Sequence, residues 1–378
     1  MVFPALEMVW GLPVRLDRGD GVVVKYVEKG VAHMGVYEQL PGALLPWYEE
    51  HKRDLPWRED REPYHIWLSE IMLQQTRVEA VKGYYARFLQ TLPTIEALAN
   101  ADDELLHKLW EGLGYYSRVR NLKKAAQVIM DEHGGVFPNR HEDILALPGI
   151  GVYTAGAICS IAFGQKKAAV DGNVLRVISR ITENDTPIDN ASFKKEVQAS
   201  LEAVYPADAA GFTQALMELG ATLCGPNWKP RCSDCPCLSF CGGGNHGTAE
   251  CYPVKKPKAK RRVEHKTVFV LSCDGRYAVE KRPQNGLLAG LWQFPNVEGW
   301  LEPEQALEAV EGMLMRPREL IRQVQRKHIF THIEWEMRCF YVDVQEITPG
   351  FVWMTGEEIH QEAALPTAFR QFWEDNHV

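Results

Sequence analysis

The 378-residue sequence predicts an all-α domain followed by a smaller α+β domain. The length exceeds what one hydrophobic core usually supports, which favours two domains. Apolar residues recur at helical spacing from about residue 41 to 220, and this region lacks strand-like alternation. After a basic stretch at 253–262, runs of strand-forming residues replace that pattern.

Composition and charge exclude several classes of protein. With 46% hydrophobic and 24% charged residues, the chain is ordinary for a globular protein. No apolar run reaches about 18 residues, so we expect no membrane helix. Charged residues interrupt the first thirty positions, which excludes a secretory signal and predicts a cytoplasmic location if the source is bacterial. Residues 266–378 carry −6 of the net charge of −8, so the acidic sum leaves a nucleic-acid partner open.

The helical domain is predicted to cover residues 34–247. Residues 1–33 fit neither pattern and are expected to form an extension whose order the sequence does not determine. Within the domain, amphipathic stripes predict helices, and proline or glycine marks the stops between them. The clearest stripes are Leu68, Ile71, Met72 and Gln75; Leu105, Leu106, Leu109 and Trp110; and Ala125, Ala126, Ile129 and Met130.

A turn with two glycines lies in the stretch LPGIGVYTAG at 147–156. Leu147 is expected to end one helix, and Thr154 to lie at the start of the next. Gly149 and Gly151 allow a tight turn and let backbone N–H groups approach a phosphate at a helix N-terminus. The pattern indicates sequence-independent DNA binding, although a plain turn between two helices gives the same signal.

Two acidic residues are candidates for catalysis. Glu70 lies among Trp67, Leu68 and Ile71, and a carboxyl group in such apolar surroundings has a raised pKa. Considered alone, however, Glu70 would be interpreted as an exposed helical residue. Asp171, in the stretch VDGNVLRV, precedes a helix, where it can cap that helix or stabilise positive charge in a cleft.

Four cysteines, Cys224, Cys232, Cys235 and Cys241, have the spacing C-x7-C-x2-C-x5-C in a loop after a helix. Four thiolates so close together in a chain without a secretory signal indicate a metal centre rather than disulfides. Zinc and a [4Fe–4S] cluster are both compatible with four thiolates, although the asymmetric spacing is less like paired zinc knuckles. Cys237 is interpreted as a bystander.

A basic linker is predicted at 248–265 and the α+β domain at 266–378. The linker has two prolines and no apolar periodicity, so we expect an exposed tether, or a tether that also contacts phosphates. Its basic residues are Lys255, Lys256, Lys258, Lys260, Arg261 and Arg262. In the last domain we expect a hairpin at 267–281, a helix at 304–315, and strands near 335–344 and 351–354.

These features together resemble the helix–hairpin–helix DNA glycosylases with a carboxyl-terminal iron–sulfur loop, and within them the MutY adenine glycosylases. The resemblance runs from about Leu44 to the chain end. The first cysteine gap is usually six residues in that family and is seven here, which leaves the loop geometry open. The matching stretches are LPWR at 55–58, WLSE at 67–70, MLQQT at 72–76, GLGYY at 112–116 and DGNV at 171–174.

The resemblance implies base excision repair of duplex DNA that contains adenine opposite 8-oxoguanine or guanine. Glu70 would protonate the flipped adenine, and Asp171 would stabilise the oxocarbenium-like sugar until water completes hydrolysis. Tyr153 and Asn173 would hydrogen-bond to these carboxyl groups, and the four cysteines would bind a [4Fe–4S] cluster. The implied DNA contacts are Gln75 as a wedge, Tyr115 beside it, Gln214 at the adenine edge, Arg58, Gly149 and Gly151.

Two further expectations follow from the resemblance. Tyr153 stands where related bifunctional enzymes have a lysine nucleophile, so we expect a monofunctional glycosylase with little or no strand cleavage. The last domain resembles the nudix fold, but its residues 303–311 lack the acidic array that binds magnesium for pyrophosphate hydrolysis. In the family this domain reads the oxidised guanine. The matching loop here is Phe330-Thr331-His332, with threonine in place of the usual serine.

Three other functions are less compatible with the sequence. Tyr153 and the additional domain disfavour a glycosylase-lyase that acts on damaged pyrimidines. The presence of both Glu70 and Asp171 disfavours a non-catalytic damage-binding protein, and the missing acidic array disfavours a nudix hydrolase. We expect a monomer that binds double-stranded DNA and no membrane.

Overall fold

The structure, a computed structural model, describes residues 29–257 and 260–374. Most of the predicted extension at 1–33 lies outside the described residues, as does Lys258 of the basic linker. Residues 29–33 belong to the first helix, which begins at Lys29. None of the helices in the described ranges is both long and apolar enough to cross a membrane.

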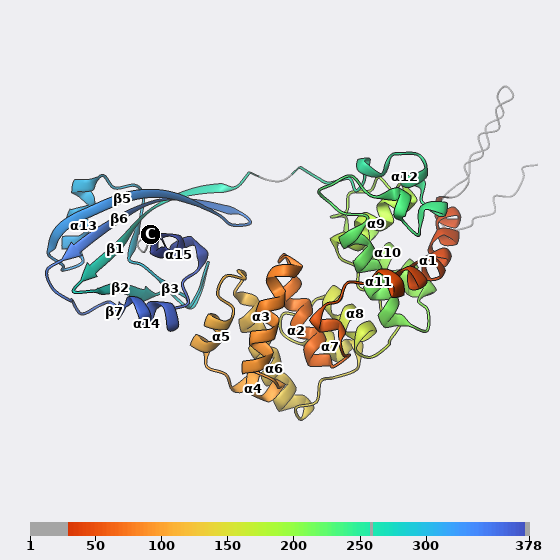
Figure 1. Cartoon of the computed structure of the whole chain (residues 1–378), viewed down its shortest axis with the longest axis horizontal. Helices are drawn as coiled ribbons and strands as arrows, with labels where there is room; N and C mark the ends of the chain where they lie inside the picture. Colours follow the sequence, from red (N-terminus) through yellow and green to blue (C-terminus); the bar gives the residue numbers. More distant parts are fainter. Residues whose placement is uncertain (1–28, 258–259, 375–378) are drawn as a thin grey trace, which may run out of the picture.

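The first domain is helical, and its described residues contain no strand, which confirms the all-α prediction (Figure 1). Its elements are α1 (Lys29–His51), η1 (Pro56–Arg58), α2 (Pro63–Leu73), α3 (Val78–Thr91), α4 (Ile95–Asn100), α5 (Asp103–Leu109), α6 (Ser117–His133), α7 (His141–Ala146), α8 (Val152–Ile161), α9 (Gly172–Thr182), α10 (Ala191–Val204), α11 (Ala209–Thr222), η2 (Cys232–Asp234), η3 (Leu238–Phe240), α12 (Gly242–Asn245) and η4 (Ala249–Cys251).

The helical domain has two hydrophobic cores. One joins α2 to α8 and is centred on large side chains such as Trp67, Phe88 and Trp110. The other joins α1 to α9–α11 and includes Leu44 and Phe212. Figure 1 shows α1 beside α11, although the two helices are far apart in the sequence. Helix α1 therefore packs in the same core as α9–α11, and the helical domain has an interface between its two cores.

The second domain is built on a seven-stranded sheet with the order β3-β2-β1-β6-β5, in which β1 and β6 are parallel. β4 pairs with β1, and β7 pairs with β2. The strands are β1 (Arg262–Cys273), β2 (Arg276–Lys281), β3 (Trp292–Gln293), β4 (Asn296–Glu298), β5 (Pro317–Ile329), β6 (Ile333–Val344) and β7 (Val352–Thr355). The helices are α13 (Pro303–Gly312), α14 (Gly356–Gln361) and α15 (Thr367–Glu374).

Alternating side chains divide the core of this domain between the two faces of the sheet. Val268 and Val270 of β1 pack with α14 and α15, whereas Phe269 and Leu271 pack with α13. The predicted hairpin is present as β1 and β2, joined by a turn with positive φ at Gly275. The α+β prediction for this domain is thereby confirmed.

One strand, the linker and one helix differ from the prediction. β5 was missed because it is an exposed edge strand, rich in charged residues, that is held by backbone pairing with β6. The predicted linker at 248–265 is too long at both ends. Packing against the helical domain continues to Val254, whose carbonyl accepts a hydrogen bond from the Ile188 N–H (3.1 Å), and β1 already begins at Arg262. The predicted helix at 304–315 is α13, which ends at Gly312.

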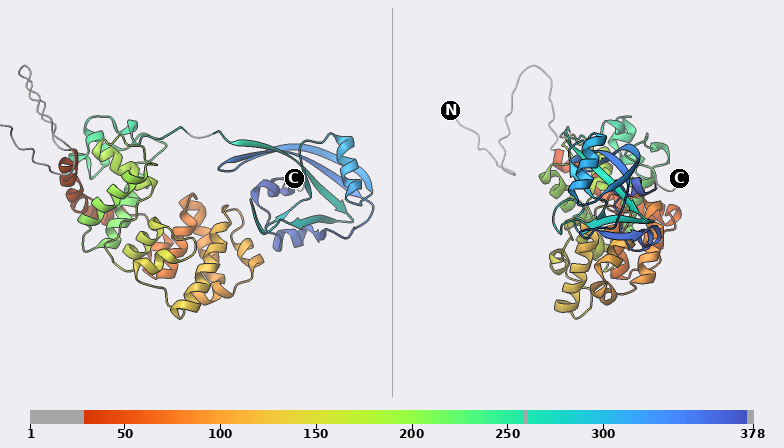
Figure 2. Two further views of the ribbon diagram at one scale, coloured as in Figure 1. Left: turned by 180° about the vertical axis from the view of Figure 1, so that it is seen from behind. Right: turned by 90° about the vertical axis from the view of Figure 1, so that its left-hand side faces the viewer.

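The two domains contact each other on the side of α5 and α6 (Figures 1 and 2). The indole N–H of Trp292 donates to the carboxylate of Glu104 (2.9 Å), and the Leu365 N–H donates to Glu111 (3.0 Å). Leu291, in the sheet domain, joins the core of the helical domain. This contact lets the loop between β5 and β6 reach the helical domain.

Candidate active site

A cavity of about 610 Å³ lies where the two cores of the helical domain meet. A volume of this size accommodates a small organic molecule or a nucleoside. Residues of η1, α2 and α8 line it from one core, and residues of α9 and α11 from the other. The predicted site residues in its lining are Arg58, Glu70, Gln75, Tyr153, Asp171, Asn173 and Gln214.

Glu70 is the more buried acid of the predicted pair. It lies on α2 among apolar residues, and it is only 5% exposed. The hydroxyl of Tyr153, on α8, donates a hydrogen bond to its Oε2 (2.8 Å). Burial raises the pKa of Glu70 to about 7, and the Asp171 charge adds to this, although Tyr153 and Arg58 oppose it. A carboxyl group with this pKa is suited to donate a proton near neutral pH.

Asp171 faces the same cavity from the second core and also caps α9. Its Oδ1 accepts hydrogen bonds from the backbone N–H groups of Asn173 and Val174 (2.8 Å each). Its Oδ2 accepts a hydrogen bond from the side-chain amide of Asn173 (2.6 Å). Asp171 therefore has two roles. It caps α9, and the same hydrogen bonds hold its carboxylate at the cavity.

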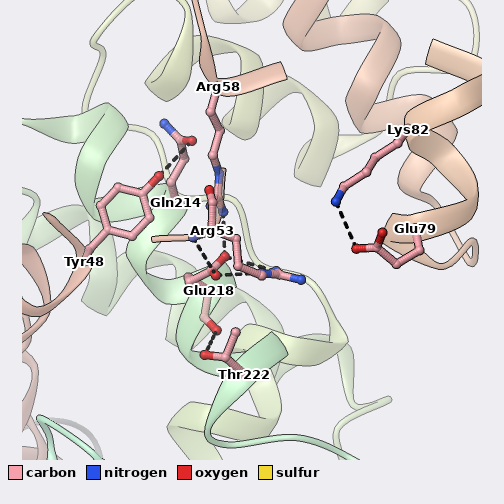
Figure 3. Close-up of polar contacts among 8 residues, drawn as sticks. All are labelled: Tyr48, Arg53, Arg58, Glu79, Lys82, Gln214, Glu218 and Thr222. Atoms are coloured by element: carbon pink, nitrogen blue, oxygen red, sulfur yellow. Dashed lines mark hydrogen bonds and ion pairs between the residues drawn. The ribbon is translucent and has the colours of Figure 1, made fainter. Parts of the chain in front are cut away.

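A polar cluster on α11 and its neighbours forms another part of the wall (Figure 3). The Tyr48 hydroxyl donates to Oε1 of Gln214 (3.1 Å), which fixes the orientation of that amide. One helical turn later, the fully buried Glu218 binds the guanidinium groups of Arg53 and Arg58 (2.6 and 2.7 Å). The structure thus places Arg58, a predicted DNA contact, in the cavity wall with its guanidinium group already bound to a carboxylate.

Arg118, a buried residue that the sequence did not single out, holds the two wedge candidates. The stripe through Gln75 predicted a helix there, but α2 ends at Leu73, and Gln75 has a φ of 57°. Tyr115 has a φ of 49°, and its hydroxyl donates a hydrogen bond to Gln75. Arg118 ends α2 because it binds carbonyl groups that a longer helix would use. Its acceptors are the carbonyl oxygens of Ile71, Met72, Gln74, Leu113 and Gly114.

The glycine turn lies between α7 and α8, as predicted. Gly149 has a φ of 78°, and a Cβ at this position would lie 2.6 Å from the Cβ of Asn121, so only glycine fits. Gly151 is exposed at the N-terminus of α8, where backbone N–H groups can bind a phosphate.

The four predicted cysteine ligands line one small cavity in the loop after α11. The guanidinium group of Arg180 donates to the Sγ of Cys224 (3.3 Å), and the Gly244 N–H donates to the Sγ of Cys241 (3.3 Å). Within residues 29–257 and 260–374, no three Cys, His, Asp or Glu side chains are close enough to bind a single ion. In a [4Fe–4S] cluster each thiolate binds a different iron, so four thiols that line one cavity match the number of ligands such a cluster needs. The donor set therefore fits such a cluster.

Comparison with known proteins places this chain in a family. Residues 68–206 match the HhH-GPD superfamily of base excision DNA repair proteins, and residues 267–375 match the NUDIX domain family. The human adenine DNA glycosylase is 37% identical over 399 residues, which cover 87% of this chain and 72% of the human protein. The chain belongs to the adenine DNA glycosylase family. It is therefore a DNA glycosylase, and the alternative of a non-catalytic damage-binding protein is set aside.

Other relatives of this DNA glycosylase extend the match. The adenine DNA glycosylase of Arabidopsis thaliana is 38% identical and covers 82% of this chain and 54% of its own length. Among solved structures, a thermostable thymine-DNA glycosylase is 29% identical, with a TM-score of 0.51. It covers 58% of this chain and all of its own chain. That likeness supports the fold of the helical domain.

The predicted reader loop of the glycosylase lies next to the wedge pair. The Thr331 hydroxyl, between β5 and β6, is 3.2 Å from the Tyr115 hydroxyl, and Tyr115 in turn contacts Gln75. The ring of Phe330 packs edge-on against Trp335, with ring centroids 4.9 Å apart. His332 is exposed. The structure therefore brings Thr331 to Tyr115 and Gln75, with Phe330 packed in the sheet domain.

Three residues at or near the site were not predicted from the sequence: Arg53, Arg118 and Glu218. Glu218 had the same signal as Glu70, since it is an acid in the apolar stretch ALMELGA, four residues after Gln214. Arg118 lies two residues after the GLGYY stretch, but no local pattern indicates that its side chain reaches the carbonyl groups at the end of α2.

Proposed function

We propose that this glycosylase removes adenine paired with 8-oxoguanine or guanine from duplex DNA, as a monomer and without cleaving the strand. One observation carries the proposal: a single cavity brings together Glu70, whose carboxyl group is protonatable, and Asp171 at the start of α9. An acid and a carboxylate facing one substrate are what hydrolysis of an N-glycosidic bond requires. The relatives, which are named adenine DNA glycosylases, support adenine as the base.

The proposed reaction begins with extrusion of the adenine nucleotide into the cavity, while Gln75 occupies the vacated space in the duplex and Tyr115 lies at the adjacent step. Glu70 then donates its proton to the adenine ring, which makes the base a neutral leaving group. Asp171 stabilises the positive charge that develops on the sugar. Glu70, now ionised, accepts a proton from the attacking water. Asn173 holds Asp171 in place by its amide hydrogen bond.

Tyr153 supports a reaction without strand cleavage. A strand-cleaving glycosylase forms a Schiff base with the sugar through an amine, and a phenol cannot do so. Tyr153 is engaged with Glu70, and burial raises its pKa well above the ordinary value, so its hydroxyl stays protonated and remains a donor.

Recognition of the base opposite adenine is assigned to the loop Phe330-Thr331-His332. Its position beside Tyr115 and Gln75 supports this, because a wedge inserted where adenine leaves lies next to the opposite base. The Thr331 hydroxyl can donate or accept one hydrogen bond and replaces the usual serine hydroxyl. The discrimination between 8-oxoguanine and guanine would then depend on hydrogen bonds from this loop.

The cofactor proposed is a [4Fe–4S] cluster on Cys224, Cys232, Cys235 and Cys241. Bound there, it would cross-link the loop through four iron–sulfur bonds and provide a one-electron redox centre. Arg180 supports this assignment because it donates to the Cys224 sulfur, which stabilises a thiolate. Iron analysis should give about four irons per chain, and zinc in its place would contradict the assignment.

A substrate comparison tests the proposed activity. The protein is incubated with duplexes that contain adenine opposite 8-oxoguanine, adenine opposite thymine, or thymine glycol, and the products are treated with hot alkali. Cleavage at adenine opposite 8-oxoguanine is expected. Cleavage of the thymine-glycol duplex alone would contradict the proposal.

A borohydride trap tests the absence of strand cleavage separately. The protein should give no abundant covalent adduct with DNA, and strand breaks should appear only after alkali treatment. An abundant adduct would show an amine nucleophile and would refute the role given to Tyr153.

A further inference from the structure

Glu218 has no part in the chemistry described so far, yet its carboxylate lies in the wall of the same cavity as Glu70. Its side chain is completely buried. Oε1 accepts hydrogen bonds from the backbone N–H (3.3 Å) and the Nε (2.6 Å) of Arg53, and Oε2 accepts two, from the Nη2 of Arg53 (3.0 Å) and the Nη2 of Arg58 (2.7 Å). Figure 3 shows both guanidinium groups converging on this one carboxylate.

The surroundings of Glu218 keep it ionised. Burial alone would raise its pKa, but the hydrogen bonds and charges of Arg53 and Arg58 outweigh burial and hold the pKa below the usual value. Each arginine is also partly buried, with 36% and 13% of the two side chains exposed. Without Glu218, two positive charges would face each other and the cavity with no anion between them.

Arg58 and Glu70 line the same cavity, so the charge of Arg58 connects this cluster to Glu70. The groups whose charge or hydrogen bond acts on Glu70 are Tyr153 from α8, Asp171 from the start of α9, and Arg58 from η1. A positive charge on Arg58 favours the ionised form of Glu70, which is the form that cannot donate a proton. Glu218 offsets that charge and holds the guanidinium against α11.

We propose that Glu218 is a positioning residue for base excision, which holds the guanidinium groups of Arg53 and Arg58 in the cavity wall and limits the positive charge that faces Glu70. This inference rests on the proposed role of Glu70 as the acid. It differs from that role because Glu218 acts through the two arginines and is not required to touch the base.

The test is the pH profile of single-turnover adenine release by the E218Q variant, measured from about pH 5 to about pH 9. The wild-type rate should fall as the pH rises through the pKa of Glu70, because only protonated Glu70 is active. In E218Q, the unpaired Arg58 favours ionised Glu70, so the fall should begin at lower pH. A displacement of about one pH unit corresponds to an approximately tenfold lower rate on the alkaline side.

Two control variants distinguish the loss of the Glu218 charge from a general loss of structure. Glu79 forms an exposed ion pair with Lys82 (3.1 Å) near the cavity but outside its lining, so E79Q removes the same charge and should keep the wild-type profile. E218D retains the carboxylate, and we expect its profile to return to the wild-type pH even if its maximal rate is lower. Thermal unfolding shows whether each variant is folded.

If E218Q does not fold, the R53Q/E218Q double variant takes its place, since it removes one cation together with the carboxylate. Arg58 remains unpaired in it, so the alkaline fall should again begin at lower pH.

An unchanged profile in folded E218Q, or equal shifts in E218Q and E79Q, would overturn the positioning role of Glu218. If Glu70 is not the acid, the result is different, because the wild-type rate would then show no fall near the pKa of Glu70.

Discussion

Glu70 and Glu218 are two buried carboxyl groups in the wall of one cavity, and their surroundings are opposite. Glu70 receives one hydrogen bond, from a neutral tyrosine hydroxyl, and burial raises its pKa to about 7. Glu218 receives hydrogen bonds from two guanidinium groups, and its pKa is lowered. Burial alone therefore does not decide the charge of a carboxyl group, because the donors around it do. One cavity can hold an acid and a fixed anion at the same pH.

The largest effect is expected from E70Q, which removes the acid and leaves the cavity shape intact. Glutamine can still accept the hydrogen bond of Tyr153, but it has no proton to give to the base. We expect single-turnover release of adenine to fall by about 10² to 10⁴-fold, with DNA affinity kept. Excision kinetics and a gel-shift titration measure the two quantities, and wild-type excision in E70Q would remove Glu70 from the mechanism.

Stability should respond to the two carboxyl groups with opposite signs. The pKa of Glu70 is about 7 in the folded protein and 4.5 ordinarily, so the folded state binds an extra proton between these values. Wild-type stability therefore falls as the pH rises through this window, by about 3 kcal/mol at most, and E70Q should lack this fall.

The lowered pKa of Glu218 predicts the reverse dependence. Its stabilisation is present above the ordinary carboxyl pKa and is lost as the pH falls through the lowered value, so E218Q should be most destabilised near neutral pH. Urea unfolding of both variants at about pH 3, about pH 5 and about pH 8 covers the two windows, because the Glu218 dependence lies below about pH 5 and the Glu70 dependence above it. The same dependence on pH in both variants would contradict the assigned charge states.

A smaller effect is expected from Y153F, which should shift the pKa of Glu70 in the direction opposite to that expected for E218Q. The Tyr153 hydrogen bond favours ionised Glu70, so its loss should raise the pKa of Glu70. The alkaline fall in excision rate should then move to higher pH, by up to about one unit. E218Q and Y153F should thus shift the same profile in opposite directions, and a common direction would contradict the electrostatic explanation.

The smallest effect is expected at Thr331, outside the cavity. T331V keeps the shape of the side chain and removes the hydroxyl, which lies 3.2 Å from that of Tyr115. One lost hydrogen bond corresponds to about 1 kcal/mol, or about a fivefold lower preference for adenine opposite 8-oxoguanine over adenine opposite guanine. T331S, which keeps the hydroxyl, is the control. An unchanged preference in T331V would remove this hydroxyl from recognition.

Local patterns predicted the parts of the molecule that depend on neighbours in sequence. The helical periodicity, the glycine turn at Gly149 and the hairpin at Gly275 are of this kind, because each depends on a few adjacent residues. The exposed edge strand β5 was missed because backbone pairing with β6, rather than an apolar face, holds it. The end of α2 before Gln75 was missed because Arg118, more than forty residues later, binds the carbonyl groups there.

By itself, the sequence determined the two domains, the acids Glu70 and Asp171, and the set of four cysteines. It could do so because residue types and short spacings carry that chemistry. Only the tertiary structure decided which groups share one cavity with the two acids and how far burial raises the pKa of Glu70. The physical reason is that a pKa depends on burial and on donors such as Tyr153 of α8 and Arg58 of η1, which folding brings to the two acids from distant parts of the chain.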